Sequence, residues 1–169
     1  QMAKEAKEAG VPLITPASTN DKLTSDAGPY VSRICFKDSF QGAVLANFGK
    51  GVMVTPHGIA VDKDGNVWIA DFSGNKAGTK GHQVHKFTPK GEKLMSLGIA
   101  GKPGNADGQF NQPNDVVTGP DGSIYVSDGH DGQGMTTNAA LAEGLKRGAT
   151  ARISKFSPDG KFIKSWGKL

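Results

Sequence analysis

The sequence has little of what marks several common classes of protein. It contains one cysteine, Cys35, in 169 residues, which excludes an internal disulfide framework. We interpret Cys35 as a small residue of a half-buried strand. No apolar run approaches the roughly 20 residues that a membrane-spanning helix needs, so no membrane span is expected.

Positive charge is present but is not concentrated in one place. The formal net charge is +4, and the lysines are scattered along the chain rather than clustered with aromatic residues. A nucleic-acid surface would be expected to gather basic residues into a patch. We therefore do not expect a nucleic-acid partner, and we assign the charge to solubility.

Turn-forming residues are abundant, with 24 glycines and 9 prolines against only 7% aromatic residues. Residues 55–98 show how they are used. Apolar residues alternate on both sides of Asp64-Gly65, a pattern that predicts a tight antiparallel hairpin. A second pair of strands, at 84–87 and 93–97, flanks the turn at 89–91. Four strands in about forty residues make up one propeller blade.

The same pattern recurs further along the chain. Residues 113–128 align with 56–71 at an offset of 57, and residues 153–160 align with 84–91 at an offset of 69. The 12 additional residues fall in a loop at 130–150, where Asn138 is expected to be the N-cap of a short helix. A weaker half-copy precedes both, with strands expected at 31–37 and 43–48. The fold class predicted is all-β, with propeller blades at 31–49, 55–98 and 113–167.

About two and a half blades are fewer than the four to eight that close a propeller. We therefore expect the chain to be a fragment. Residues 31–169 would be the partial propeller. Residues 1–30 would be an N-terminal extension and connector, with a short helix at 1–10 followed by an irregular segment.

The repeated pattern reads Pro-x-x-Ile/Val-x-Val-x-x-Asp-Gly-x-Val/Ile-Trp/Tyr-Ile/Val-x-Asp, followed by a Val/Ile-x-Lys-Phe-x-Pro-x-Gly hairpin. It resembles NHL repeats over about residues 30–169. Within that class the chain is similar to the peptidyl-α-hydroxyglycine α-amidating lyase branch and its bacterial relatives. The segments that carry this similarity are 55–66, 82–87, 110–116, 124–129 and 156–163, with Trp166-Gly167 after them.

The resemblance implies a six-bladed propeller with zinc and calcium as cofactors. His57 of the Pro-His-Gly motif would be one of three zinc ligands, each from a different blade, and the other two would lie beyond Leu169. Ile59 would offer its backbone carbonyl to calcium. His130 stands where the family usually has a catalytic Tyr, which makes it the catalytic candidate. From the residues alone it could be a base, a metal ligand or an exposed loop residue, and we favour the last. The inner strands of all blades line the propeller axis, so their first residues would converge on one mouth.

The activity implied is cleavage of a peptidyl-α-hydroxyglycine into an amidated peptide and glyoxylate, in a periplasmic or extracellular protein. A peptide or small-molecule substrate would bind at the propeller mouth. Three alternatives stay open: a relative that has lost the chemistry, an NHL module that binds protein or RNA, and a streptogramin-lyase-like or lactonase-like propeller enzyme. Fold alone does not decide among them.

The remaining histidines and several acids are expected to be structural. His82 and His85 would lie on opposite faces of one strand and so would not share a metal. The side chains of Asx residues at turns bond to their own turn, and this is the role expected of four acids. They are Asp62, Asp64, Asp121 and Asp159.

Overall fold

The computed structural model describes residues 49–130, 135 and 137–167, together with residue 8 and two short strands nearer the N-terminus. The chain divides into two compact units, residues 1–44 and 45–169. In the first unit, β1 (Leu13–Thr15) pairs in parallel with β2 (Val31–Arg33). The connector predicted as irregular therefore contains a strand. Val31–Arg33 is a strand as predicted, but its partner is β1. Cys35 and the expected strand at 43–48 lie outside the described residues.

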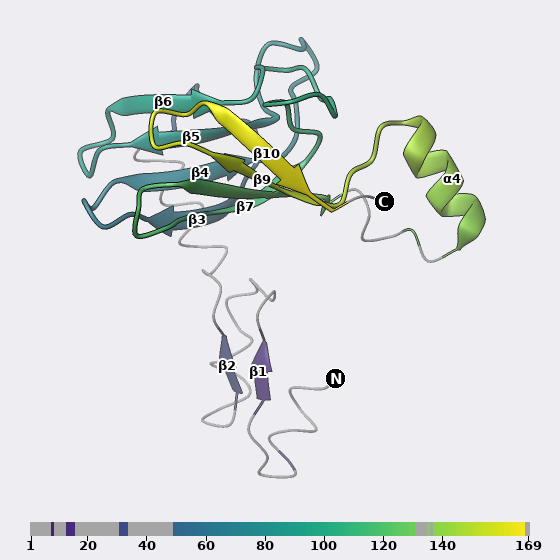
Figure 1. The fold of residues 1–169 in the computed structure, drawn as a ribbon, viewed down its shortest axis with the longest axis horizontal. Coiled ribbons are helices and arrows are strands. Elements are labelled where there is room, and N and C mark those ends of the chain that lie inside the picture. The colour runs from purple at the N-terminus through teal and green to yellow at the C-terminus, as the bar shows by residue number, and fades with distance from the viewer. Residues whose placement is uncertain are drawn as a thin grey trace. The chain divides into compact units, whose positions relative to one another are not determined.

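The second unit begins with a four-stranded antiparallel sheet in the order β3-β4-β5-β6 (Figure 1). Its hairpin turns follow the predicted chemistry. Gly65 and Gly91 both have φ above +80°, and each donates its backbone N–H across a turn. The strands are β3 (Pro56–Val61), β4 (Val67–Asp71), β5 (Gln83–Phe87) and β6 (Lys93–Leu97).

A second sheet repeats this arrangement in the order β7-β8-β9-β10. Its strands are β7 (Pro113–Thr118), β8 (Ile124–Asp128), β9 (Arg152–Phe156) and β10 (Phe162–Trp166). The prediction of two sister sheets from the 57- and 69-residue offsets is therefore confirmed. The described fold is all-β except for helix α4 (Asn138–Lys146), which lies in the predicted insertion.

The two sheets pack face to face around one hydrophobic core. Trp68 and Val84 of the first sheet meet Val126 and Phe156 of the second, and all four are at most 2% exposed. Phe110, in the connection between the sheets, is completely buried in the same cluster. Burying an aromatic side chain of this size contributes about 2–3 kcal/mol, so this core holds the two sheets together.

The two inner strands β3 and β7 approach each other closely at Gly58. A Cβ atom at this position would lie 2.5 Å from the carbonyl oxygen of Asn114 and 2.6 Å from the Cα of Asp115. Only glycine fits such an approach of backbone to backbone. Gly58 therefore sets the distance between the two sheets where their first strands begin.

Helix α4 differs from the prediction at its start. Its N-cap is Thr137, whose backbone is extended and whose hydroxyl accepts the N–H of Ala140 at 3.1 Å. The expected cap, Asn138, is instead the first helical residue. Both residue types cap helices well, so the pattern alone placed the start one residue late. Among the described residues, no helix is long and apolar enough to cross a membrane.

Candidate functional site

Two buried aspartates fix the points at which the inner strands begin. The Asp71 carboxylate accepts the N–H groups of Val54 and Thr55, the latter at 2.6 Å. The Asp128 carboxylate accepts those of Asn111 and Gln112 in the same way, the latter at 2.7 Å. Asp71 and Asp128 occupy the same repeat position and are at most 1% exposed. Each therefore ties the segment that enters an inner strand to the end of the neighbouring strand.

The two carboxylates differ in their charge partners. Asp128 is paired with the guanidinium of Arg152 at 3.1 Å, which also binds the Gln109 carbonyl at 2.7 Å. Burial raises the pKa of Asp71, although the N–H groups of Thr55 and Val54 oppose that rise. The second sheet therefore has an arginine beside its buried aspartate, whereas the first sheet has Gln83 at the equivalent position.

His57 is the second residue of β3 and is half-buried. Its Nδ1 lies 2.9 Å from the backbone carbonyl oxygen of Asn114. A carbonyl can only accept, so Nδ1 carries the proton and Nε2 is left as an acceptor in the neutral ring. The register between β3 and β4 shifts between Pro56 and Ile59. Bulges of this kind turn side chains at strand ends and are frequent beside functional sites.

The structure brings His57 and His130 together. Their ring centroids are 4.7 Å apart and their planes cross at 79°. Phe72, directly after β4, completes the group, with its centroid 5.7 Å from His57 and 4.8 Å from His130. His130 is half-buried, so it is not the exposed loop residue that its position after β8 would allow. We call these three residues the ring cluster.

Asp115 lies beside this cluster, at the close approach of β7 to Gly58. Loss of hydration raises the pKa of Asp115, while the N–H of Val116 and the charge of His57 act to lower it. Asp115 and Phe72 were not anticipated from the sequence. Phe72 has no counterpart in the repeat, because the equivalent position in the second sheet is Gly129.

Ile59 lies two residues further along β3, opposite Ile69 of β4, and its side chain is 5% exposed. β3 is the edge strand of its sheet, so alternate backbone carbonyls along it point away from β4. The side chain is therefore a core residue. A cation could interact only with its backbone.

The other two histidines bind different partners. The prediction that both lie on one strand was wrong for His82, which lies just before β5. His82 has φ +56° and its Nδ1 donates to the Asn111 carbonyl. His85 is buried on the sheet, with its Nδ1 2.9 Å from the Ser96 hydroxyl. Burial, together with the charge of Lys93, lowers the pKa of His85 to about 4. Across the described part of the chain, no group of three His, Cys, Asp or Glu residues could hold a metal.

The acids assigned to turns behave as predicted where the structure shows their bonds. The Asp62 carboxylate accepts the N–H groups of Asp64 and Asn66 and pairs with Lys86 at 3.0 Å. Burial acts to raise the pKa of Asp62, but bonds from Lys86, Asn66 and Trp68 hold it well below its ordinary value. In the second sheet Asp121 accepts the Ser123 N–H at 3.0 Å.

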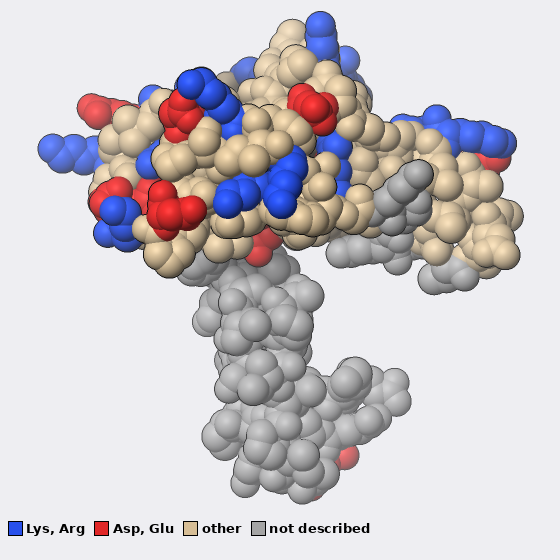
Figure 2. Space-filling model, viewed as in Figure 1, with Lys and Arg blue, Asp and Glu red and all other residues tan. Residues whose placement is uncertain are grey.

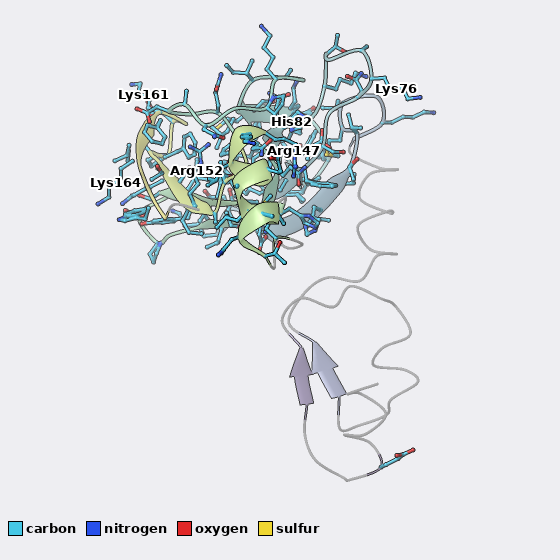
Figure 3. The ribbon with its side chains drawn as sticks, turned by 90° about the vertical axis from the view of Figure 1, so that its right-hand side faces the viewer. Lys76, His82, Arg147, Arg152, Lys161 and Lys164 are labelled. Atoms are coloured by element: carbon cyan, nitrogen blue, oxygen red, sulfur yellow. The ribbon has the colours of Figure 1, made fainter. Side chains whose placement is uncertain are left out.

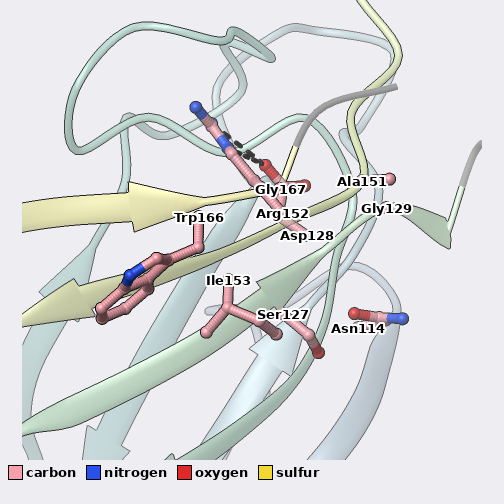
Figure 4. Close-up of a pocket in the computed structure, with 9 residues that line it drawn as sticks. All are labelled: Asn114, Ser127, Asp128, Gly129, Ala151, Arg152, Ile153, Trp166 and Gly167. Carbon is pink, nitrogen blue, oxygen red and sulfur yellow. Dashed lines mark hydrogen bonds and ion pairs between the residues drawn. The ribbon is translucent and has the colours of Figure 1, made fainter.

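A groove of about 490 Å³ lies at the end of the second sheet where β7 begins (Figure 4). Asp128 and Arg152, joined as described above, line it together with Asn114. Neither His57 nor His130 is among its lining residues. The groove and the ring cluster are therefore separate features. The remaining lining residues are Ser127, Gly129, Ala151, Ile153, Trp166 and Gly167.

Basic side chains do not gather into one patch on the faces shown. Figure 2 shows Lys and Arg interspersed with Asp and Glu over the sheets. Lys76 lies far from Lys161 and Lys164 (Figure 3). This agrees with the scattered lysines of the sequence.

Comparison with known proteins first identifies the class of repeat. The family model for the NHL repeat matches residues 54–87, which include β3, β4 and β5. This match identifies an NHL repeat in the first sheet, and the two four-stranded antiparallel sheets are consistent with blades of an NHL-repeat β-propeller.

Comparison with individual relatives then shows which NHL-repeat proteins the chain resembles. The chain is 34% identical over 134 residues to mouse peptidyl-glycine alpha-amidating monooxygenase, covering 78% of this chain and 11% of that protein. It is 38% identical over 116 residues to a probable peptidyl-alpha-hydroxyglycine alpha-amidating lyase of Caenorhabditis elegans, covering 67% and 31%. Human NHL repeat-containing protein 3 is 35% identical over 83 residues, covering 46% and 23%. The chain thus spans about a tenth to a third of the length of these relatives, and resembles the amidating lyases.

Proposed function

We propose that this chain is part of a propeller lyase that cleaves peptidyl-α-hydroxyglycine at its C–N bond, giving a peptide amide and glyoxylate. His57 would be a zinc ligand, the Ile59 carbonyl would bind calcium, and His130 would act on the substrate. The names of the relatives support this reaction class.

The orientation of His57 is the observation that carries the proposal. A metal-bound histidine commonly donates its second ring N–H to a carbonyl, which fixes both the ring and the tautomer. The bond from Nδ1 to the Asn114 carbonyl does this here and leaves Nε2 without a proton, as metal binding through that atom requires. Because the carbonyl belongs to the neighbouring sheet, packing of the two sheets holds the imidazole in place.

The residues present fit one zinc ligand and not a complete site. A catalytic zinc site needs three protein ligands and an open position. The described residues supply His57 but no group of three suitable side chains. The other ligands would therefore come from outside the described part. Zinc bound there would polarise a substrate oxygen as a Lewis acid.

The ring cluster gives His130 a defined place beside His57. A general acid or base must reach the proton that it moves, and imidazole is the side chain most often used. Contact with the His57 and Phe72 rings holds His130 next to the proposed ligand. We propose that His130 exchanges a proton with the substrate, in the role of the family's Tyr. Phe72, whose ring lies against both histidine rings, would form an apolar wall beside them.

Release of glyoxylate from a peptidyl-α-hydroxyglycine substrate by the full-length protein tests the proposal. We expect His57→Ala to abolish the activity and His130→Ala to reduce kcat by about 100- to 10,000-fold, the usual range for a general acid or base. Lys76→Ala is the control, because Lys76 lies on the loop between β4 and β5 and should leave activity unchanged. Full activity in His57→Ala would refute the proposal.

Protein binding is a second candidate function. Val117 and Ile153 on the second sheet are 55% and 42% exposed, which is high for large apolar side chains. If the protein is a binding module rather than a lyase, substitutions in the ring cluster would not weaken its binding to a partner protein.

A further inference from the structure

Phe72 is the one member of the ring cluster that can neither bind a metal nor transfer a proton. It follows β4 directly and is half-buried, so part of its surface is exposed. Its ring centroid lies 5.7 Å from that of His57 and 4.8 Å from that of His130, with interplanar angles of 62° and 42°. The ring therefore lies beside both the proposed zinc ligand and the proposed acid or base.

The backbone around Phe72 is tied to the segment that enters β3. The Phe72 N–H donates to the Thr55 carbonyl at 3.0 Å, and the hydroxyls of Ser73 and Thr55 are 2.7 Å apart. Asp71, on the other side, accepts the Thr55 N–H. Three consecutive residues are thus bonded to a residue only two positions before His57. The same backbone therefore positions the phenyl ring and the imidazole.

The loop that follows holds this backbone from the other end. Asn75 closes the loop, since its Oδ1 accepts the N–H groups of Thr79 and Lys80 at 2.9 and 3.2 Å. At the end of the loop, Gly81 has no room for a Cβ, which would overlap the Ser73 carbonyl oxygen. The residue after the phenylalanine is therefore packed against the far end of its own loop, and the ring is preorganised for binding.

The repeat does not require an aromatic ring at this position. Its counterpart in the second sheet is Gly129, where a Cβ would lie 2.9 Å from the Thr150 carbonyl oxygen and 3.1 Å from the Cα of Ala151. The second sheet thus forms without a side chain there. Among the described residues, the hydrophobic core between the sheets does not include Phe72. Packing of the sheets therefore gives no reason for a phenylalanine beside the two histidines, whereas recognition of an apolar group would.

The proposed reaction identifies the part of the substrate that would meet this ring. The reacting carbon, placed between His57 and His130, carries a carboxylate and is bonded to the amide nitrogen that follows the preceding residue. An apolar ring disfavours a neighbouring carboxylate, because it displaces water without supplying a hydrogen bond. It favours an apolar side chain, and an aromatic one most, since two aromatic rings gain from their packing geometry as well as from burial.

We propose that Phe72 determines specificity for the residue that precedes the α-hydroxyglycine, and that large apolar side chains, aromatic ones above all, are preferred there. This inference rests on the proposed lyase function and adds a substrate class to it. A peptide that ends in phenylalanyl-α-hydroxyglycine would pack its phenyl ring on Phe72. A small residue at that position would lose the contact, and an acidic residue would lose hydration as well.

Two substrates test this with the full-length protein, namely N-acetylphenylalanyl-α-hydroxyglycine and N-acetylalanyl-α-hydroxyglycine. Release of glyoxylate gives kcat and KM for each. We expect kcat/KM to favour the phenylalanyl substrate by about tenfold, the lower end of the range for a change in apolar contact. Phe72→Ala should remove this preference, mainly by raising KM for the phenylalanyl substrate, because the lost contact is made in the ground state as well as in the transition state.

Two further variants separate recognition from folding. Lys76→Ala is the matched control, because Lys76 is exposed on the same loop and should keep the preference of the unchanged protein. Phe72→Leu keeps most of the apolar volume, so it should stay folded and retain part of the preference. If Phe72→Ala lowers the midpoint of thermal unfolding, Phe72→Leu decides, and an undiminished preference in that variant would overturn the inference.

The pattern of loss distinguishes this role from a structural one. An equal fall in kcat/KM for both substrates in Phe72→Ala would show that the ring only holds His130 in place, and it would overturn the inference. An unchanged ratio with unchanged activity would do the same and would leave the lyase function intact.

Absence of glyoxylate from both substrates with the unchanged full-length protein would refute the lyase function itself. Equilibrium binding of the two product amides, N-acetylphenylalaninamide and N-acetylalaninamide, then decides about Phe72 separately. Tighter binding of the phenylalanine amide that is lost in Phe72→Ala would support the apolar subsite. Equal binding of the two amides would overturn it.

Discussion

Replacement of Phe110 by Ala should be among the most destabilising changes in the chain. The ring is completely buried, fits the space left by Gly98 and lies 5.7 Å from the Phe156 ring. Truncating a buried phenylalanine removes its transfer free energy and leaves a cavity, at a cost of about 3–5 kcal/mol. The backbone of Gly98 on one side and β9 on the other limit collapse of that cavity, so we expect about 4 kcal/mol.

Urea unfolding followed by Trp68 fluorescence measures this loss. Trp166→Ala is the comparison, because Trp166 is 43% exposed and should cost only about 1 kcal/mol. Phe110→Leu should fall between the two, since it keeps most of the apolar volume. A loss below about 1 kcal/mol for Phe110→Ala, or equal losses at the two positions, would refute this account of the interface between the sheets.

Three further predictions concern single side chains. Because burial lowers the pKa of His85 to about 4, below its ordinary 6.5, the folded state resists protonation. Stability should therefore fall by about 3 kcal/mol between pH 6.5 and 4, and His85→Gln should remove that part of the pH dependence of urea unfolding. A pH dependence of stability that is the same in His85→Gln as in the unchanged protein would contradict this prediction. Gly58→Val should separate β3 from β7 and lower the midpoint of thermal unfolding, whereas Ala77→Val, on the exposed loop between β4 and β5, should not; equal shifts would argue against the close approach. Thr137→Ala should destabilise α4 by about 1 kcal/mol, and Asn138→Ala by less, as measured by amide exchange; the reverse order would restore Asn138 as the cap.

Much of the fold could be predicted because each strand carries its own local signals. Alternation of apolar residues and the Asp-Gly and Pro-x-Gly turns define the hairpins without reference to the rest of the chain. Repetition then identified the two sheets as equivalent. The start of α4 was wrong by one residue because Thr137 and Asn138 are both good caps, and only the backbone conformation selects between them.

The site could be predicted only in part. The Pro-His-Gly motif pointed to His57, but its bond to Asn114 joins residues 57 positions apart and depends on how the sheets pack. The contact of His130 with His57 and Phe72 also depends on how the sheets pack. Phe72 breaks the repeat, so no pattern marked it. Metal ligation by His57 and Ile59 stays a prediction.

Zinc content tests the central claim most directly. The full-length protein, which would include the other ligands, is loaded with zinc, dialysed and analysed for bound metal, alongside its His57→Ala form and the control His82→Gln. The account predicts zinc in the unchanged protein and in the control, and its loss when His57 is replaced. Equal zinc in the protein and in His57→Ala would contradict the assignment of His57 as a ligand.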